Sequence, residues 1–354
     1  ERTLILRLSE PDERLPEALA CAMAMPCRED VFTAAAGRYG MKADLLVCNG
    51  PLTVSSWSET AVRLTKNEHY TGDFAAKAAG VTLSFGDTDA ERIDAISGGM
   101  SDLALLRAQS VAAANNARLA VTRSRDTLWV LWIRPDAKTV GDPAVSAALK
   151  RALGREVIAD VLPAGFSGTD RLLADDLAVG QARVADVIPA PAASPADPVG
   201  AQAALVEALK RYNGVLPTLT LRYADEEGVK PIAGRIAQQW QKELGAVVNI
   251  EAVPADDLIA RVDKSRFDLA LCPLTADDGR AATALARLAK WIGADATGAE
   301  TPEAAASREA ALLADSHLFP VAVSGRCLAA SDDVTGAKLD LQQGLLALYR
   351  WGKE

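Results

Sequence analysis

The chain has 354 residues, 49% of them apolar and 24% charged, which is the composition of a globular protein with a large core. This length favours two structural units over one. The net charge of -9 and a pI near 5.0 argue against nucleic acid and anionic membrane surfaces as partners. The sequence has no run of about 18 consecutive apolar residues, so no transmembrane helix is predicted.

The chain opens on a predicted strand, Glu1 to Ser9, followed by a short helix over Pro16–Ala24 with proline in its first turn. The sequence begins at Glu1 and not at Met, and its first residues do not have the pattern of a signal peptide. A natural mature terminus rarely opens within a sheet. We therefore expect this sequence to be a piece of a longer protein.

The segment Met25–Tyr70 has a specific order of parts. A turn at Gly37–Gly40 is followed by Asn49–Pro51 and then by an alternating strand that contains Trp57. A second alternating strand closes on Lys66–Tyr70. We expect Trp57 to pack in the core.

The next region contains further alternating and buried elements. Val81–Phe85 is a predicted strand, Asp89–Ile96 a helix that ends on glycine, and Leu103–Leu106 another strand. An apolar strand over Asp126–Ile133 carries two tryptophans.

Two helices follow, and the first has a clear start. Asp142 can cap the free N–H groups of that helix, and the proline after it fits the first turn. The helix ends at Gly154, and the second helix covers Arg155–Leu162. A third helix is predicted over Ala201–Tyr212.

The last third of the chain contains a β-α-β unit. Strands over Thr218–Tyr223 and Val247–Val253 flank a helix over Lys230–Leu244, which implies parallel strands joined by a right-handed crossover. The remaining predicted elements are a helix over Ala255–Val262, a strand over Phe267–Leu271, a loop over Cys272–Arg280, a helix over Pro302–Ala314 and a strand over Phe319–Val323.

Three stretches carry a family resemblance: Met25–Tyr70, DPAVSAALKRALGREVIADVLPAG and LTLRYADEEGVKPIAGRIAQQWQKELGAVVNIEAV. Together they resemble the extracytoplasmic solute-binding proteins, family 5, that serve bacterial peptide and nickel ABC importers. The chain departs from the pattern at Leu52, where an aromatic residue is usual, and at Ser146 or Ala147, where arginine is usual.

The resemblance implies an α/β fold of the type II periplasmic-binding-protein kind, with two lobes of mixed sheets. Lobe I, incomplete, would comprise residues 1–122 plus 322–354, and lobe II residues 123–321. The hinge would lie near Ala120–Thr122 and Val321–Val323. A monomer of this kind closes on a peptide ligand and delivers it to ABC permease subunits, as a cell-surface lipoprotein or in the periplasm. With lobe I incomplete, we expect weak peptide binding or none.

The predicted loop after Phe267–Leu271 is the candidate ligand site, because ligands gather at the carboxyl ends of strands in open α/β sheets. The resemblance places Asp277 where the family has an aspartate that pairs with the α-ammonium of a bound peptide. Leu274 stands at the family's tryptophan position, beside Thr275. Asp278 is a further ligand candidate, but both aspartates also fit a solvated turn.

Trp129 and Trp132 are the remaining candidates, since aromatic side chains supply rigid contact area to a ligand, although core packing also accounts for them. No cofactor or metal is expected. Neither histidine has a metal-ligand spacing, and none of the five cysteines forms a C-x-x-C pair. The possible pairing of Cys21 with Cys27 stays open.

Other functions remain as alternatives. The same fold could bind a nickel chelate, haem or an oligosaccharide, or could serve as a sensor or receptor without transport. Enzymes are disfavoured: there is no G-x-S-x-G, P-loop or Rossmann motif, and a cysteine hydrolase would need a base beside its cysteine.

Overall fold

The computed structural model describes residues 3, 5–8, 15–19, 25–85, 88–264, 267–295, 298–339 and 347–353. The prediction of a strand over the first nine residues is wrong for the residues that the structure describes there. Thr3 and Ile5–Leu8 have no regular secondary structure, and Ile5 is 74% exposed, because no neighbouring strand pairs with their backbone. The first helix, α1, covers Leu15–Leu19, and the rest of its expected range lies outside the described residues.

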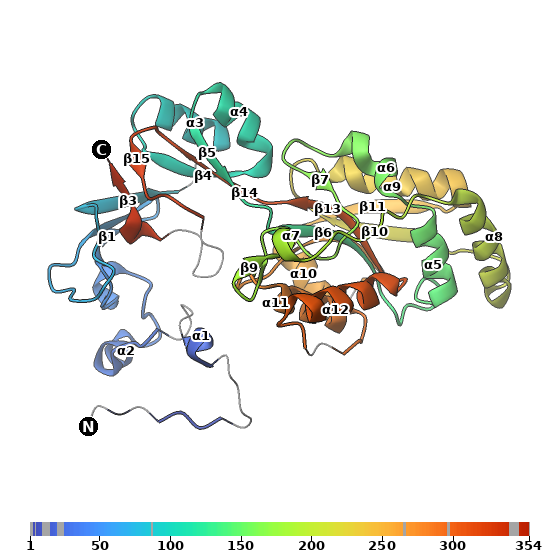
Figure 1. Cartoon of the computed structure of the whole chain (residues 1–354), viewed down its shortest axis with the longest axis horizontal. Coiled ribbons are helices and arrows are strands. Elements are labelled where there is room, and N and C mark those ends of the chain that lie inside the picture. The colour runs from blue at the N-terminus through green and yellow to red at the C-terminus, as the bar shows by residue number, and fades with distance from the viewer. Residues whose placement is uncertain are drawn as a thin grey trace.

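A six-stranded mixed sheet forms the larger part of the molecule (Figure 1). Strand β10 is parallel to β11 and β12, whereas β6 is antiparallel to β12 and β13. In spatial order the strands are β11 (Val248–Val253), β10 (Leu219–Ala224), β12 (Leu269–Thr275), β6 (Thr127–Ile133), β13 (Leu318–Ser324) and β7 (Ser167–Gly168).

Helices cover both faces of this sheet; Figure 1 shows α6 and α9 on one side and α11 and α12 on the other. Helix α9 packs on β10 and β11, and α10 packs on β10 and β12. The helices are α5 (Pro143–Arg151), α6 (Arg155–Ile158), α7 (Val184–Val187), α8 (Pro198–Leu209), α9 (Val229–Leu244), α10 (Ala255–Val262), α11 (Ala281–Trp291) and α12 (Pro302–Ala314).

The expected β-α-β unit is confirmed. Ile232, Ile236 and Trp240 lie on one face of α9 and are fully buried, as their four-residue spacing predicts. Gly245 ends the helix in the left-handed conformation, with φ of +66°. The start of α5 is confirmed as well, because the Asp142 carboxylate accepts a hydrogen bond from the N–H of Ala144 at 2.9 Å.

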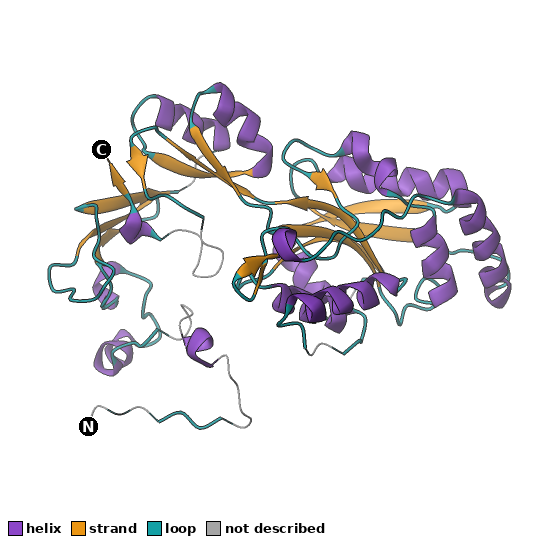
Figure 2. Ribbon diagram, in the orientation of Figure 1, coloured by secondary structure: helices purple, strands orange, loops and turns teal. Residues whose placement is uncertain are grey.

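A second, smaller hydrophobic core is separate from the first; Figure 2 shows its helices and strands as a group beside the large sheet. It is formed by a three-stranded sheet under two helices: β4 (Leu103–Arg107), β14 (Arg326–Ala330), β5 (Ala120–Arg123), α3 (Asp89–Ser97) and α4 (Val111–Asn116). The remaining elements of this part are the sheet of β1 (Leu52–Trp57), β2 (Ala61–Lys66) and β3 (Gly80–Ser84), the pair β15 (Val334–Thr335) and β16 (Gly352–Lys353), and helix α2 (Glu29–Ala35).

The expectation that Trp57 belongs to the core is wrong, since its side chain is 46% exposed. A β-bulge between Val54 and Ser56 places Trp57 on the same face as Val62. However, Trp57 is the last residue of an outer strand, so no further strand covers it.

Strand β12 is longer than expected and replaces half of the predicted loop. It continues through Leu274 and Thr275, although it contains Pro273. Trp129 of β6 forms a non-hydrogen-bonded pair with Pro273, and β10 pairs with β12 only as far as Leu271. The missing N–H of the proline therefore faces a free edge, where it removes no ladder hydrogen bond. Helix α11 was not expected, although its leucines have helical spacing.

The chain passes twice between the two cores, at Ser124–Asp126 and at Gly325. The hinge expected near Ala120–Thr122 and Val321–Val323 stays a prediction. Those residues lie inside β5, which was not predicted, and inside β13, which extends one residue beyond the predicted strand at each end. The α/β class with mixed sheets is confirmed.

Candidate functional site

Three strands of the large sheet have an end beside the crossings. The register pairs Thr127 of β6 with Thr275 of β12 on one side and with Ser324 of β13 on the other. The hydroxyl oxygens of Thr127 and Thr275 lie 3.3 Å apart. Because the crossing residues 124–126 and 325 directly adjoin these ends, this edge of the sheet faces the smaller core.

The loop after β12, Ala276–Arg280, extends from this edge and is held in a defined turn. The carboxylate of Asp278 accepts hydrogen bonds from the N–H of Arg280 at 3.0 Å and from the hydroxyl of Thr283 at 2.7 Å. Gly279 has a φ of +67°, which favours glycine, and its carbonyl accepts the N–H of Ala178 at 2.7 Å. Asp278 therefore shapes the turn at the start of α11.

Asp277 differs from its neighbour: its side chain is exposed. Within the described part of the chain its carboxylate has neither a hydrogen bond nor an ion pair. The nearby acids have partners. Asp175 pairs with Arg125 at 2.6 Å, and Asp176 accepts the backbone N–H of Arg125 at 2.6 Å. Asp175 and Asp176 are therefore engaged with Arg125, whereas the Asp277 carboxylate has no such partner among the described residues.

The two crossings are held together by polar groups that sequence reasoning missed. The guanidinium of Arg326 forms an ion pair with the carboxylate of Asp126, which is 2% exposed. The Ser124 hydroxyl donates to Asp126 at 2.8 Å and accepts the N–H of Arg326 at 2.9 Å. The only sequence signal was a charged residue at the start of the apolar strand predicted over Asp126–Ile133, and it did not identify its partner 200 residues away.

Three of the other expected site residues are buried in the core, and the fourth is not. Leu274 is 3% exposed, whereas Thr275 is half-buried. Trp129 and Trp132 are fully buried on opposite faces of β6, so they cannot line one surface. The indole N–H of Trp129 donates to the Ser324 hydroxyl at 2.8 Å, and that of Trp132 donates to the carbonyl of Trp291 at 3.0 Å.

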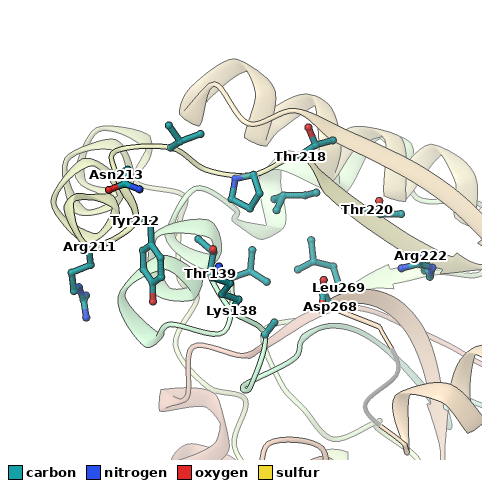
Figure 3. Close-up of a pocket in the computed structure, with 15 residues that line it drawn as sticks. Lys138, Thr139, Arg211, Tyr212, Asn213, Thr218, Thr220, Arg222, Asp268 and Leu269 are labelled. Atoms are coloured by element: carbon teal, nitrogen blue, oxygen red, sulfur yellow. The ribbon is translucent and has the colours of Figure 1, made fainter.

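A hollow of about 680 Å³ lies at the other end of the large sheet (Figure 3). It is bordered by Leu219 and Leu269, the first residues of β10 and β12, so it lies at the amino ends of these strands. Its arginines are already engaged: Arg211 pairs with Asp142 at 3.0 Å, and Arg222 pairs with a glutamate of β11. This hollow lies away from the strand ends where ligands gather in such sheets.

The described residues contain no group of three or more histidine, cysteine or acidic side chains that could hold a metal ion. Burial raises the pKa of the Cys272 thiol, which points at the Val130 carbonyl at 3.8 Å. Both ring nitrogens of His317 are occupied, by Asp315 and by the carbonyl of Gly141. Cys21, the possible partner of Cys27, lies outside the described residues. None of the described helices is both long and apolar enough to cross a bilayer.

Among solved structures, several oligopeptide-binding proteins have the same fold. The substrate-binding domain of an oligopeptide ABC transporter from Bacillus anthracis has a TM-score of 0.72 at 19% identity. Listeria monocytogenes OppA bound to peptide scores 0.74 at 15% identity. Haemophilus influenzae OppA in complex with RPPGFSPFR scores 0.71 at 17% identity. Each match covers 98% of this chain and 72% of the solved chain.

These likenesses confirm the expected periplasmic-binding-protein-like fold. No curated protein sequence matches the chain. A model of one protein family matches residues 1–294, and its description is "Bacterial extracellular solute-binding proteins, family 5 Middle". Because this match covers most of the 354 residues, the chain belongs to the family 5 bacterial extracellular solute-binding proteins, as its motifs indicated.

Proposed function

We propose that this chain is the substrate-binding component of an ABC importer, that it takes up oligopeptides or dipeptides, and that it works outside the cytoplasmic membrane. Family membership supports solute binding. The likeness to two OppA proteins that hold peptides supports this ligand class. A permease at the membrane is the partner to which the ligand would be delivered.

The two hydrophobic cores correspond, in this proposal, to two lobes that close on the ligand. Lobe II comprises Thr127–Ser324, and lobe I the remaining elements on either side of it in sequence. Closure is a rotation about the crossings at Ser124–Asp126 and Gly325. Short crossing segments between separately packed cores suit such a hinge.

Asp277 is the residue that we propose binds the amino terminus of the peptide. Its exposed carboxylate, without a partner among the described residues, lies on the loop at the lobe-facing edge of the large sheet. The α-ammonium of a peptide is a cation that can donate a hydrogen bond to this carboxylate. Such a charge-assisted hydrogen bond is stronger than one between neutral groups. The burial of Trp129 and Trp132 gives no support to an oligosaccharide site, which needs exposed aromatic faces.

Calorimetry with the peptide RPPGFSPFR tests this proposal. We expect Asp277→Asn to weaken binding about tenfold, equivalent to about 1.4 kcal/mol. Acetylating the peptide's amino terminus should cause the same loss, and the two changes together should cost little more than either alone. The control is Asp257→Asn, an exposed acid of α10, which should leave affinity unchanged. Equal affinities for Asp277→Asn and the unsubstituted chain would overturn the role of Asp277.

A further inference from the structure

The two parts of the molecule also touch beside the crossings, through a turn that follows β4. Three successive residues of this interlobe turn (residues 107–110), namely Arg107, Ala108 and Gln109, contact loops of the larger part. Because Arg107 of β4 pairs with Arg326 of β14, the turn adjoins the crossing at Gly325. In Figure 1 the loop between α6 and β7 lies beside the start of α4, where these contacts are made.

A buried carboxylate of the smaller part fixes the shape of the interlobe turn. Asp89, the first residue of α3, is 7% exposed. Its carboxylate accepts the N–H of Arg107 at 2.9 Å, the guanidinium Nε of Arg107 at 3.3 Å and the hydroxyl of Ser110 at 2.6 Å. The turn is therefore ordered by its own lobe, so little conformational entropy is lost when it meets the other one.

Glu227, in the loop between β10 and α9, receives two of the contacts. Its carboxylate pairs with the guanidinium of Arg107 at 3.2 Å, and its carbonyl accepts the side-chain amide of Gln109 at 2.8 Å. Both members of the ion pair are more than half exposed, so each contact alone stabilises little. Two directional contacts on one residue nevertheless favour one arrangement of the two parts over others.

Two glycines allow the backbones to approach closely at this point. Gly165 has a φ of +83°, and a Cβ atom there would lie 2.5 Å from the carbonyl carbon of Ala108 and nearer still to its carbonyl oxygen. Gly228 has a φ of +82°, and a Cβ atom there would lie 2.7 Å from the ring of Pro163. The two receiving loops thus pack on each other, and the turn fits against Gly165 with no room for a side chain.

These contacts lie at the edge of the large sheet that faces the smaller part. The Glu227 loop follows β10 and the Asp277 loop follows β12, and these two strands are adjacent and parallel. Both loops therefore leave the sheet at the same edge. A rotation that carries lobe I away from the Asp277 loop must also separate the interlobe turn from the Glu227 loop.

We propose that Arg107, Gln109, Gly165 and Glu227 are positioning residues, which hold lobe I against the edge that carries Asp277 before any ligand arrives. This role rests on the proposed function, in which the lobes rotate about the crossings. A protein that already populates the arrangement competent for binding has a higher apparent affinity, because a smaller part of the binding free energy is used to move the lobes.

Pulsed electron paramagnetic resonance of the whole chain, without peptide, measures the distance between the lobes. In the labelled chain, p-acetylphenylalanine replaces Asp94 of α3 and Glu303 of α12, both exposed, and carries the nitroxides without use of the native cysteines. We expect one principal distance. Because no ligand is present, this readout also decides the role of the turn in a chain that fails to bind peptide.

Two substitutions loosen the contact in different ways. Glu227→Gln removes the charge but keeps the carbonyl that Gln109 contacts, and should lower the ratio of the principal distance to longer ones about threefold. Gly165→Ala places a Cβ atom against Ala108, and should lower the same ratio about tenfold or more.

Each substitution has a matched control within lobe II. Glu207→Gln breaks an exposed ion pair with Lys210, which does not involve the smaller part. Gly180→Ala places alanine at a φ of +59°, where a Cβ atom has no neighbour within 4 Å. It therefore repeats the backbone strain of Gly165→Ala without the contact to lobe I. Neither control should change the distribution of distances.

Two results would overturn the proposal. The first is that Glu227→Gln and Gly165→Ala keep the distances of the unsubstituted chain, even where they lower its stability in urea, because the residues would then act within lobe II alone. The second is that the controls change the distances as much. If Gly165→Ala does not fold, as judged by circular dichroism, the double variant Gln109→Ala, Glu227→Gln decides, with an expected change of about fivefold.

Discussion

Arg326 and Asp126, 200 positions apart in sequence, form an ion pair where the chain crosses between its two cores. The carboxylate is 2% exposed and the guanidinium 30% exposed. The Ser124 hydroxyl bonds to both residues, so the two crossing segments form one hydrogen-bonded unit.

The first prediction concerns this pair. Asp126→Asn keeps the acceptor for the Ser124 hydroxyl but leaves Arg326 without its counter-charge, and should lower the free energy of unfolding by about 2 kcal/mol. Urea unfolding followed by tryptophan fluorescence measures the change. Asp257→Asn breaks an exposed pair with Arg261 and should stay within about 0.5 kcal/mol. Equal effects of both substitutions would contradict the structural role of Asp126.

The second prediction concerns Gly325, the single residue of one crossing. A Cβ atom there would lie 2.5 Å from the carbonyl carbon of Ser124 and 2.8 Å from its hydroxyl oxygen, and nearer still to its carbonyl oxygen. Gly325→Ala should therefore destabilise the protein by at least about 2 kcal/mol, because the two crossing backbones must move apart. Its melting temperature should fall accordingly.

The control for this prediction is another glycine-to-alanine change. Gly234 lies in the interior of α9, and a Cβ atom added there would have no neighbouring atom within 4 Å beyond the backbone of its own helix. Gly234→Ala should stabilise the protein by about 0.5–1 kcal/mol. A Gly325→Ala protein as stable as the unsubstituted chain would show that the crossings are freely separable.

Much of the larger core could be predicted from sequence because its signals are local. The helical spacing of Ile232, Ile236 and Trp240, and the glycine after them, fixed α9 and the strands beside it. The errors came where distant partners decide the outcome. Pro273 argues for a loop by its type, yet it fits a strand because the adjacent strand β10 has already ended.

In the candidate site, too, features set by local sequence could be predicted, whereas contacts between distant residues could not. The loop after β12 follows from the general rule for strand ends, and Asp278 fits the turn for which its residue type is suited. The Asp126–Arg326 pair could not be predicted, because it joins residues that only the assembled fold brings together. Trp129 and Trp132 are of a residue type that often lines ligand sites, but the alternation of side chains along β6 places them on opposite, buried faces of the sheet.

The third prediction separates two adjacent aspartates. Asp278→Ala removes the acceptor for the Arg280 N–H and the Thr283 hydroxyl, and should cost about 1 kcal/mol of unfolding free energy. Asp277→Ala removes an exposed carboxylate without a partner in the described chain, and should change stability by less than about 0.5 kcal/mol. Chemical denaturation of both variants measures the contrast. A larger loss for Asp277→Ala would mean that this residue has a structural role.

The fourth prediction concerns pH. The hydrogen bond to Asp315 raises the pKa of His317 above its usual value; burial opposes this, and the Gly141 carbonyl adds to it. The Lys150 ammonium nearby acts in the opposite direction. Because the folded-state pKa exceeds the unfolded value of about 6.5, the charged imidazole stabilises the fold. This stabilisation is complete below pH 6.5 and is lost as pH rises through the folded-state value.

Histidine NMR measures this directly, since the chain has only two histidines. The His317 resonance should titrate above pH 6.5. Asp315→Asn keeps an acceptor for the His317 backbone N–H but removes the negative charge, so the pKa of His317 should fall. The stability difference between the unsubstituted chain and this variant should then shrink from pH 6 to pH 9, because neutral His317 no longer benefits from the carboxylate. A His317 pKa that is unchanged in Asp315→Asn would show that the Gly141 carbonyl, and not the carboxylate, holds the proton.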